Sequence, residues 1–184
     1  MKPFSFKAIL IVFLLMNNVL IGQELNSKID GFSINPKFGI YIGSESTGGL
    51  TFGGEVNVLK NNFIYTADFY SFNEATVFVS PVEKFQQIGL MGGKYFDKGN
   101  FRLQYQAGLG LLWGLKRTNE IINQSGFNET YKSKNFMTVG FLPKLGLKYI
   151  PASFLSVGID LQANLNLERT AFMPMLSIEI GYLK

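Results

Sequence analysis

Eight charged residues stand at alternating positions of the sequence, and they are the residues best suited to chemistry or to ion binding. Four are basic and four are acidic, so a set that faced one shared interior would be balanced and could pair internally. The same groups could instead line a narrow ion path, where charged rings set selectivity. A pair of carboxylates such as Asp68 and Glu179 could also exchange protons with a substrate. The eight residues are Lys37, Glu55, Asp68, Arg102, Lys144, Lys148, Asp160 and Glu179.

The remaining composition argues against an enzyme. The chain has no His, the commonest general base and zinc ligand, and no Cys, which removes thiol nucleophiles and thiolate metal sites. No nucleophile motif accompanies the carboxylates. We therefore predict no catalytic, cofactor-binding or metal-binding residues, and we interpret the eight charges as an interior charge network. A net charge of +4 gives no indication of a nucleic-acid partner.

The first segment is typical of an export signal. Lys2 and Lys7 accompany an apolar stretch over residues 8–21, which is too short for the roughly 20 residues that cross a bilayer as a helix. Gly22 precedes a tolerable cleavage site. We expect residues 1–22 to be removed and residues 23–184 to form one domain.

The rest of the chain alternates with a period of two. From Phe101 to Lys116 the odd positions are mostly apolar and the even ones mostly small or polar, a pattern that fits an extended strand and not a helix. The alternation recurs in seven further segments, of which the segment near residues 85–96 is the noisiest. The other six are 32–42, 50–58, 63–70, 137–149, 155–168 and 172–182. The sequence predicts eight antiparallel strands.

The connections predict how these strands are joined. Compact turns stand at 60–62, 97–100 and 151–153, whereas the polar segments 73–84 and 117–135 predict longer loops. Turns at one end and longer loops at the other are typical of outer-membrane barrels. The fold class is therefore all-β, an eight-stranded antiparallel up-and-down transmembrane β-barrel.

Strand length and face composition favour a membrane barrel. The predicted strands run about 10 to 15 residues, against roughly 5 to 6 in globular proteins. The apolar faces of the three cleanest strands carry no charge, as expected where a charge would meet lipid. Aromatic residues near the strand ends predict interfacial girdles. They are Phe63, Tyr65, Phe96, Phe101, Tyr149, Phe154 and Tyr182 at the turn end, and Phe69, Trp113, Phe136 and Phe172 at the loop end.

Three prolines conflict with a closed barrel. Pro36, Pro143 and Pro174 lie inside predicted strands, where each removes a ladder hydrogen bond. We expect bulges or strand ends at these positions.

On the signal, the eight alternating segments and the Gly-rich stretch 104–113, the chain resembles the small outer-membrane β-barrels of the OmpA-transmembrane-domain and OmpX type. The resemblance implies insertion by the barrel-assembly machinery. Such barrels usually end in an aromatic residue, whereas here Tyr182 is followed by Leu183 and Lys184.

These observations predict an exported, non-enzymatic protein of the outer membrane with a role in envelope structure or surface interaction. Its partners would be outer-membrane lipid, the assembly machinery and an external ligand at the 117–135 loop, which contains Ile121, Ile122, Phe127 and Tyr131. Two alternatives stay open. One is a narrow porin or transporter, and the other is a soluble lipocalin-like barrel that binds an apolar ligand.

Overall fold

The computed structural model describes residues 29–44, 47–75, 79–80, 82–125 and 128–183, so the predicted signal at residues 1–22 lies outside the described residues. The strands are β1 (Gly31–Gly43), β2 (Gly48–Lys60), β3 (Phe63–Glu74), β4 (Val79–Ser80), β5 (Lys84–Lys98), β6 (Phe101–Ser125), β7 (Asn128–Phe141), β8 (Lys144–Ala152), β9 (Leu155–Asn164) and β10 (Ala171–Tyr182).

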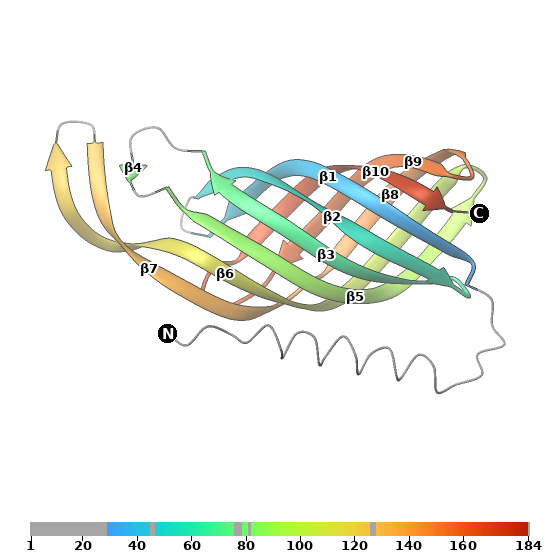
Figure 1. The fold of residues 1–184 in the computed structure, drawn as a ribbon, viewed down its shortest axis with the longest axis horizontal. Coiled ribbons are helices and arrows are strands. Elements are labelled where there is room, and N and C mark those ends of the chain that lie inside the picture. Colours follow the sequence, from blue (N-terminus) through green and yellow to red (C-terminus); the bar gives the residue numbers. More distant parts are fainter. Residues whose placement is uncertain (1–28, 45–46, 76–78, 81, 126–127, 184) are drawn as a thin grey trace.

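These strands form one sheet that closes on itself (Figure 1). Its order is β4-β7-β6-β5-β3-β2-β1-β10-β9-β8, and β6 pairs with β8 as well as with β7. Because β7 and β8 follow one another along the same edge of β6, they act as two halves of one wall strand. Within the described residues the wall thus has eight antiparallel strands, and the prediction of an eight-stranded barrel is confirmed.

Tight turns join the strands at the end that holds the C-terminus, here named the turn end. Asn61 and Asn62 have φ angles of 52° and 63°, the left-handed conformation that asparagine tolerates in two-residue hairpins. Gly99 has a φ of 62° in the next turn. The third turn lies between β8 and β9. The opposite end carries the longer connections and is named the loop end.

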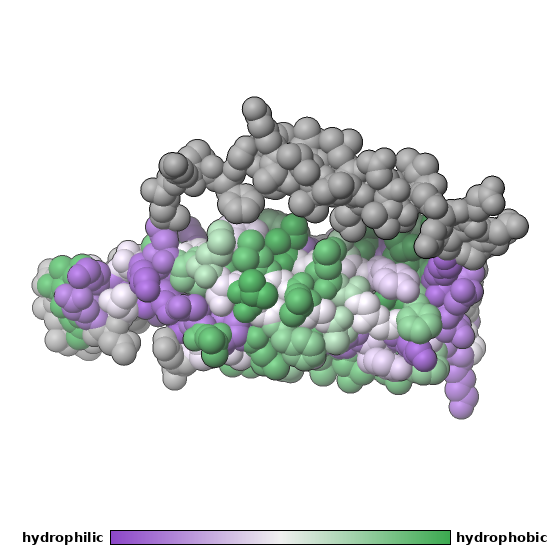
Figure 2. Space-filling model, turned by 90° about the horizontal axis from the view of Figure 1, so that it is seen from below, coloured by the Kyte–Doolittle hydropathy of each residue, from purple (hydrophilic) through white to green (hydrophobic). Residues whose placement is uncertain are grey.

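The barrel is apolar outside and polar inside. Along β1, Phe32, Ile34 and Phe38 point outward and are 48 to 57% exposed, whereas Ser33 and Lys37 point inward and are buried. Figure 2 shows the result on one face, where hydrophobic residues form a band between hydrophilic ends. This distribution is the reverse of a soluble barrel and is suited to lipid outside.

The predicted loop at 117–135 is wrong for most of its length. β6 continues to Ser125 and β7 begins at Asn128, so the two strands form a hairpin that projects beyond the barrel (Figure 1). Ile121 pairs with Tyr131 in this hairpin, with register shifts on both sides. Pairing satisfies backbone groups whatever the polarity of the side chains, which explains why a polar segment is still a strand. β4, within the predicted 73–84 loop, pairs in parallel with β7.

We expected bulges or strand ends at the three prolines; Pro143 does lie at a strand end, whereas Pro36 and Pro174 lie inside strands without a bulge. Ile34 pairs with Ile180 and Lys37 pairs with Ser177, so both strands advance by three residues across Pro36 and the register is unshifted. The same holds on both sides of Pro174. Pro143 lies in the short break between β7 and β8, where the register along β6 is also continuous. Pro36 and Pro174 are each accommodated by the loss of pairing on one side only.

Candidate functional site

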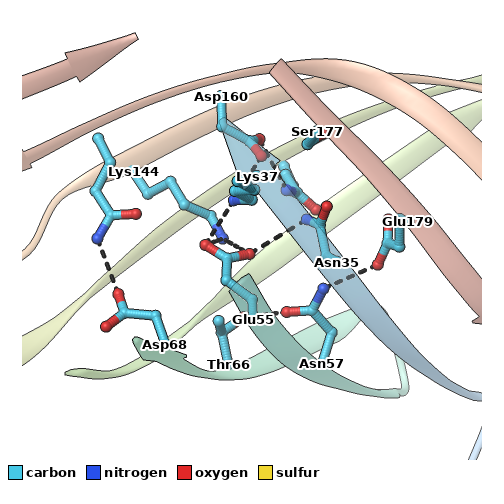
Figure 3. A network of polar contacts seen from close by, with 12 residues as sticks. Asn35, Lys37, Glu55, Asn57, Thr66, Asp68, Lys144, Asp160, Ser177 and Glu179 are labelled. Atoms are coloured by element: carbon cyan, nitrogen blue, oxygen red, sulfur yellow. Dashed lines mark hydrogen bonds and ion pairs between the residues drawn. The ribbon is translucent and has the colours of Figure 1, made fainter. Parts of the chain in front are cut away.

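Five of the eight predicted charges form an ion-pair cluster in the middle of the lumen (Figure 3). Lys37 Nζ lies 2.6 Å from Glu55 Oε1 and 2.6 Å from Asp160 Oδ2. Lys144 Nζ lies 2.8 Å from Glu55 Oε2, and Lys148 Nζ lies 2.5 Å from Asp160 Oδ2. All five side chains are inaccessible to solvent. Three ammonium groups therefore share two carboxylates, supplied by β1, β2, β8 and β9.

Neutral groups complete this cluster. The Tyr70 hydroxyl donates to Glu55 at 2.8 Å, the Gln104 amide donates to Asp160 at 3.3 Å, and Lys148 also donates to Ser177. Burying ions is tolerable only where such hydrogen bonds replace water. Strand alternation brings all of these donors to the lumen.

The predicted acid–base pair is not a pair. Asp68 accepts hydrogen bonds from the Gln87 amide at 3.2 Å and the Gln162 amide at 2.9 Å. Glu179 is held by a different set, the Ser33 hydroxyl at 2.5 Å, the Asn57 amide at 2.9 Å and the Ser156 hydroxyl at 3.1 Å. Neither carboxylate forms a salt bridge with a cation among the described residues. Each lies in its own polar layer, on opposite sides of the central cluster.

Arg102 lies apart from the other seven, at the turn end. Its guanidinium makes a bidentate contact with Asp97 at 2.7 and 2.8 Å and donates to the Leu183 carbonyl at 2.8 Å. It also stacks 4.3 Å from the centre of the Tyr95 ring. Leu183, which follows Tyr182, is buried at this end. The turn end of the lumen is closed.

A second charged group, missed by the sequence reasoning, closes the loop end. Arg169 pairs with Glu83, and Arg117 donates to Glu74 at 2.5 Å through Nη1. The backbone N–H of Arg117 donates to Glu83 at 2.8 Å, which links the two pairs. Three of these four residues belong to segments that we had treated as loops. No clear signal in the sequence marks them, because Glu83, Arg117 and Arg169 each stand beside another charged residue and alternation did not assign them to a face.

Beside this group, Lys116 Nζ contacts the Glu168 carboxylate at 2.5 Å. Glu168 lies on the β9–β10 connection and is half-buried. The hydrogen bond from Lys116 lowers the pKa of Glu168 below its ordinary value of 4.5.

Between the central cluster and the loop end, the lumen is filled by an apolar plug. Phe72 and Phe85 stack with ring centres 4.6 Å apart, and Tyr41 contacts both rings edge-on. Phe136 belongs here too, at 8% exposure, so its predicted place in the outer aromatic girdle is wrong. The plug consists of Tyr41, Tyr70, Phe72, Phe85, Leu112, Phe136, Met173 and Met175.

The outer aromatic residues of the turn end do lie outward as predicted. Phe101 and Tyr149 contact one another at 5.3 Å between ring centres. All seven residues of this girdle are at least 41% exposed. Such rings suit the boundary between lipid and water.

The site offers packing and charge compensation but no recognisable chemistry. Among the described residues, no group of three or more acidic side chains is placed to hold a metal ion. Within the same part of the chain, no helix is long and apolar enough to cross a bilayer.

Comparisons with known proteins test the fold. No family model matches the chain, and no curated protein matches it. Several solved structures do match the chain. The N-terminal β-barrel domain of Pseudomonas aeruginosa OprF is 15% identical, with a TM-score of 0.60 over 84% of this chain and 98% of that one. Neisserial surface protein A is 14% identical, with a TM-score of 0.62 over 83% and 97%.

The chain has the fold of a small outer-membrane β-barrel. A third structure agrees, the attachment invasion locus protein Ail of Yersinia pestis, 12% identical with a TM-score of 0.57 over 84% of this chain and all of that one. The predicted resemblance is thereby confirmed for the fold of this transmembrane barrel. Identities of this size show architecture alone.

Proposed function

We propose that this protein is a non-enzymatic, integral outer-membrane barrel whose lumen is sealed, and that it acts in envelope structure and surface interaction. The observation that carries the proposal is the reversed polarity of the barrel. Its outward apolar side chains are exposed while its inward charges are buried. Such an apolar outer surface is suited to contact with lipid.

The filled lumen argues against the porin alternative. A conducting path needs continuous water, whereas here the central ion pairs, the apolar plug and the charged groups at both ends occupy the interior in turn. The soluble alternative requires an apolar cavity inside and polar groups outside, the opposite of what the strands present.

The β6–β7 hairpin is our candidate for contact with an external partner. It projects past the loop end and exposes two neighbouring apolar side chains, Ile121 at 49% and Ile122 at 65%. Exposed apolar residues on a hairpin outside the lipid band suit a protein or surface ligand.

Fractionation and labelling test this proposal. The full chain, expressed with residues 1–22 in a Gram-negative host, should enter the outer-membrane fraction and migrate faster on SDS gels before heating than after. A membrane-impermeant maleimide should label Ile122→Cys on intact cells but should label Ser153→Cys, at the turn end, only after lysis. Recovery of the mature chain in the soluble periplasm would contradict the membrane location. Labelling of Ser153→Cys alone on intact cells would show the opposite orientation, with the turn end outside the cell.

A further inference from the structure

The strand pair β1–β10 joins the first and last strands of the wall, and two prolines interrupt it. Pairing of β1 with β2 is continuous through Pro36, which lies opposite Gly54, whereas pairing with β10 skips Pro36. In the same way β10 pairs with β9 through Pro174, opposite Leu161, but skips its partner in β1. Both ring nitrogens therefore face the β1–β10 seam.

This seam lacks two main-chain hydrogen bonds. A proline has no N–H to donate, and in a closed barrel there is no solvent edge where the loss is harmless. Pro143 faces β9 and removes one donor from that pairing, while the Ala163 N–H still donates to the Pro143 carbonyl at 3.0 Å. Within the described residues, β8–β9 also has two prolines, Pro143 at its start and Pro151 in the register shift near its turn, but in β1–β10 both prolines interrupt the pairing between regular segments on either side.

Buried side chains cross the same seam from inside (Figure 3). The Ser33 hydroxyl of β1 donates to Glu179 of β10 at 2.5 Å. Asn57 of β2 reaches across β1 to the same carboxylate oxygen at 2.9 Å. Lys37 of β1 reaches across β10 to Asp160 of β9 at 2.6 Å.

These three contacts, which we name the seam clasp, hold β1 and β10 together where the prolines remove main-chain hydrogen bonds. Each joins a strand on the β1 side to a strand on the β10 side, and each includes a charged group inaccessible to water, where such bonds are strong. We propose that β1–β10 is the seam at which this barrel opens, and that the seam clasp, centred on Glu179, holds it shut. Opening would join the lumen to the bilayer while the other strand pairs stay intact.

Hydrogen exchange of the full mature barrel in detergent micelles tests the proposal. In Glu179→Gln the side chain loses its charge and one acceptor oxygen. Amides of residues 31–43 and 171–182 should then exchange at least about tenfold faster, with β3 and β5 unchanged. Asp68→Asn is the matched control, because Asp68 is also a buried carboxylate held by neutral donors, but its donors lie on β5 and β9 and not across the seam. Equal acceleration in all strands, or none at the seam, would overturn the proposal.

A disulfide across the seam provides the decisive comparison. The chain has no Cys, and Phe38 lies directly opposite Leu176. In the Glu179→Gln background, oxidised Phe38→Cys/Leu176→Cys should restore slow exchange at the seam. The equivalent lock across β2 and β3, Val56→Cys/Ala67→Cys, should not. Equal protection by both locks would mean that opening is not confined to the seam.

A third variant keeps the test valid if Glu179→Gln does not fold. Pro36→Ala and Pro174→Ala together return the two missing donors to an otherwise unchanged barrel. Seam exchange should slow at least about fivefold in this double variant, the equivalent of a net hydrogen bond. Unchanged exchange would show that the prolines do not weaken the seam.

Discussion

Glu55 is the residue on which the central cluster depends most. Its carboxylate contacts Lys37 at 2.6 Å, Lys144 at 2.8 Å and the Tyr70 hydroxyl at 2.8 Å, all without access to solvent. In Glu55→Gln, Lys37 keeps its ion pair with Asp160, but Lys144 loses the one anion that it contacts among the described residues. Removing one member of a buried pair costs about 3–5 kcal/mol, because a charge stays buried without compensation.

Lys144→Met should cost less, although it deletes the same ion pair. Glu55 retains Lys37 and Tyr70, and the cluster changes from three cations and two anions to two of each. The lost charged hydrogen bonds, offset by the absence of a buried ammonium, should cost about 1–2 kcal/mol. The double variant Glu55→Gln/Lys144→Met should be more stable than Glu55→Gln by about 1–3 kcal/mol, because each remaining lysine of the cluster still contacts Asp160.

Urea unfolding in lipid vesicles measures these free energies. The single tryptophan, Trp113, reports the transition by fluorescence, and the gel shift on heating checks that each variant is folded. If Lys144→Met is as destabilising as Glu55→Gln, or if the double variant loses the sum of both effects, the reasoning on charge compensation is wrong.

Three further predictions follow from packing, the outer face and the loop end. Gly140→Ala would place a methyl group 1.9 Å from a buried amide oxygen and should lower the free energy of unfolding by about 1–3 kcal/mol in the same urea assay. Gly92→Ala, where the nearest atom would be 3.8 Å from the methyl group, should change that free energy little. Leu109→Arg, on the apolar band, should destabilise the barrel in vesicles by about 2–4 kcal/mol. Leu167→Arg, at a fully exposed side chain of the β9–β10 connection, should be neutral. The Glu168 carboxylate should titrate below 4.5 by NMR. The small contribution of its contact with Lys116 to folding stability is therefore present at neutral pH and is lost as the pH falls through that lowered pKa. A titration midpoint at or above 4.5 would contradict the contact.

The wall of this barrel could be predicted from the sequence because alternation assigns each side chain to a face. Residues such as Lys37 and Lys148 were placed in the lumen by parity alone, and the structure places them there. Parity does not say which inward groups meet across the barrel. That depends on the stagger of the strands, which brings Asp160 to Lys37 but leaves Asp68 and Glu179 in separate layers.

The loop end could not be predicted in the same way. Glu83 and Arg169 lie just outside regular alternation, and their pairing joins segments 86 residues apart. The hairpin beyond Arg117 could not be predicted because a polar ribbon outside the barrel wall has no apolar face to produce alternation. The prolines predicted bulges or strand ends; Pro143 lies at a strand end, whereas at Pro36 and Pro174 the loss of pairing on one side is sufficient.

Conductance tests the central claim, a transmembrane barrel with a sealed lumen, most directly. Purified barrel that shows the heat-dependent gel shift should be inserted into planar lipid bilayers at molar salt, with insertion verified by protease protection. We predict no reproducible single-channel steps, because side chains fill the lumen from Arg102 at one end to Arg169 at the other. Uniform steps that grow in proportion to salt concentration would show an open water path and contradict the account.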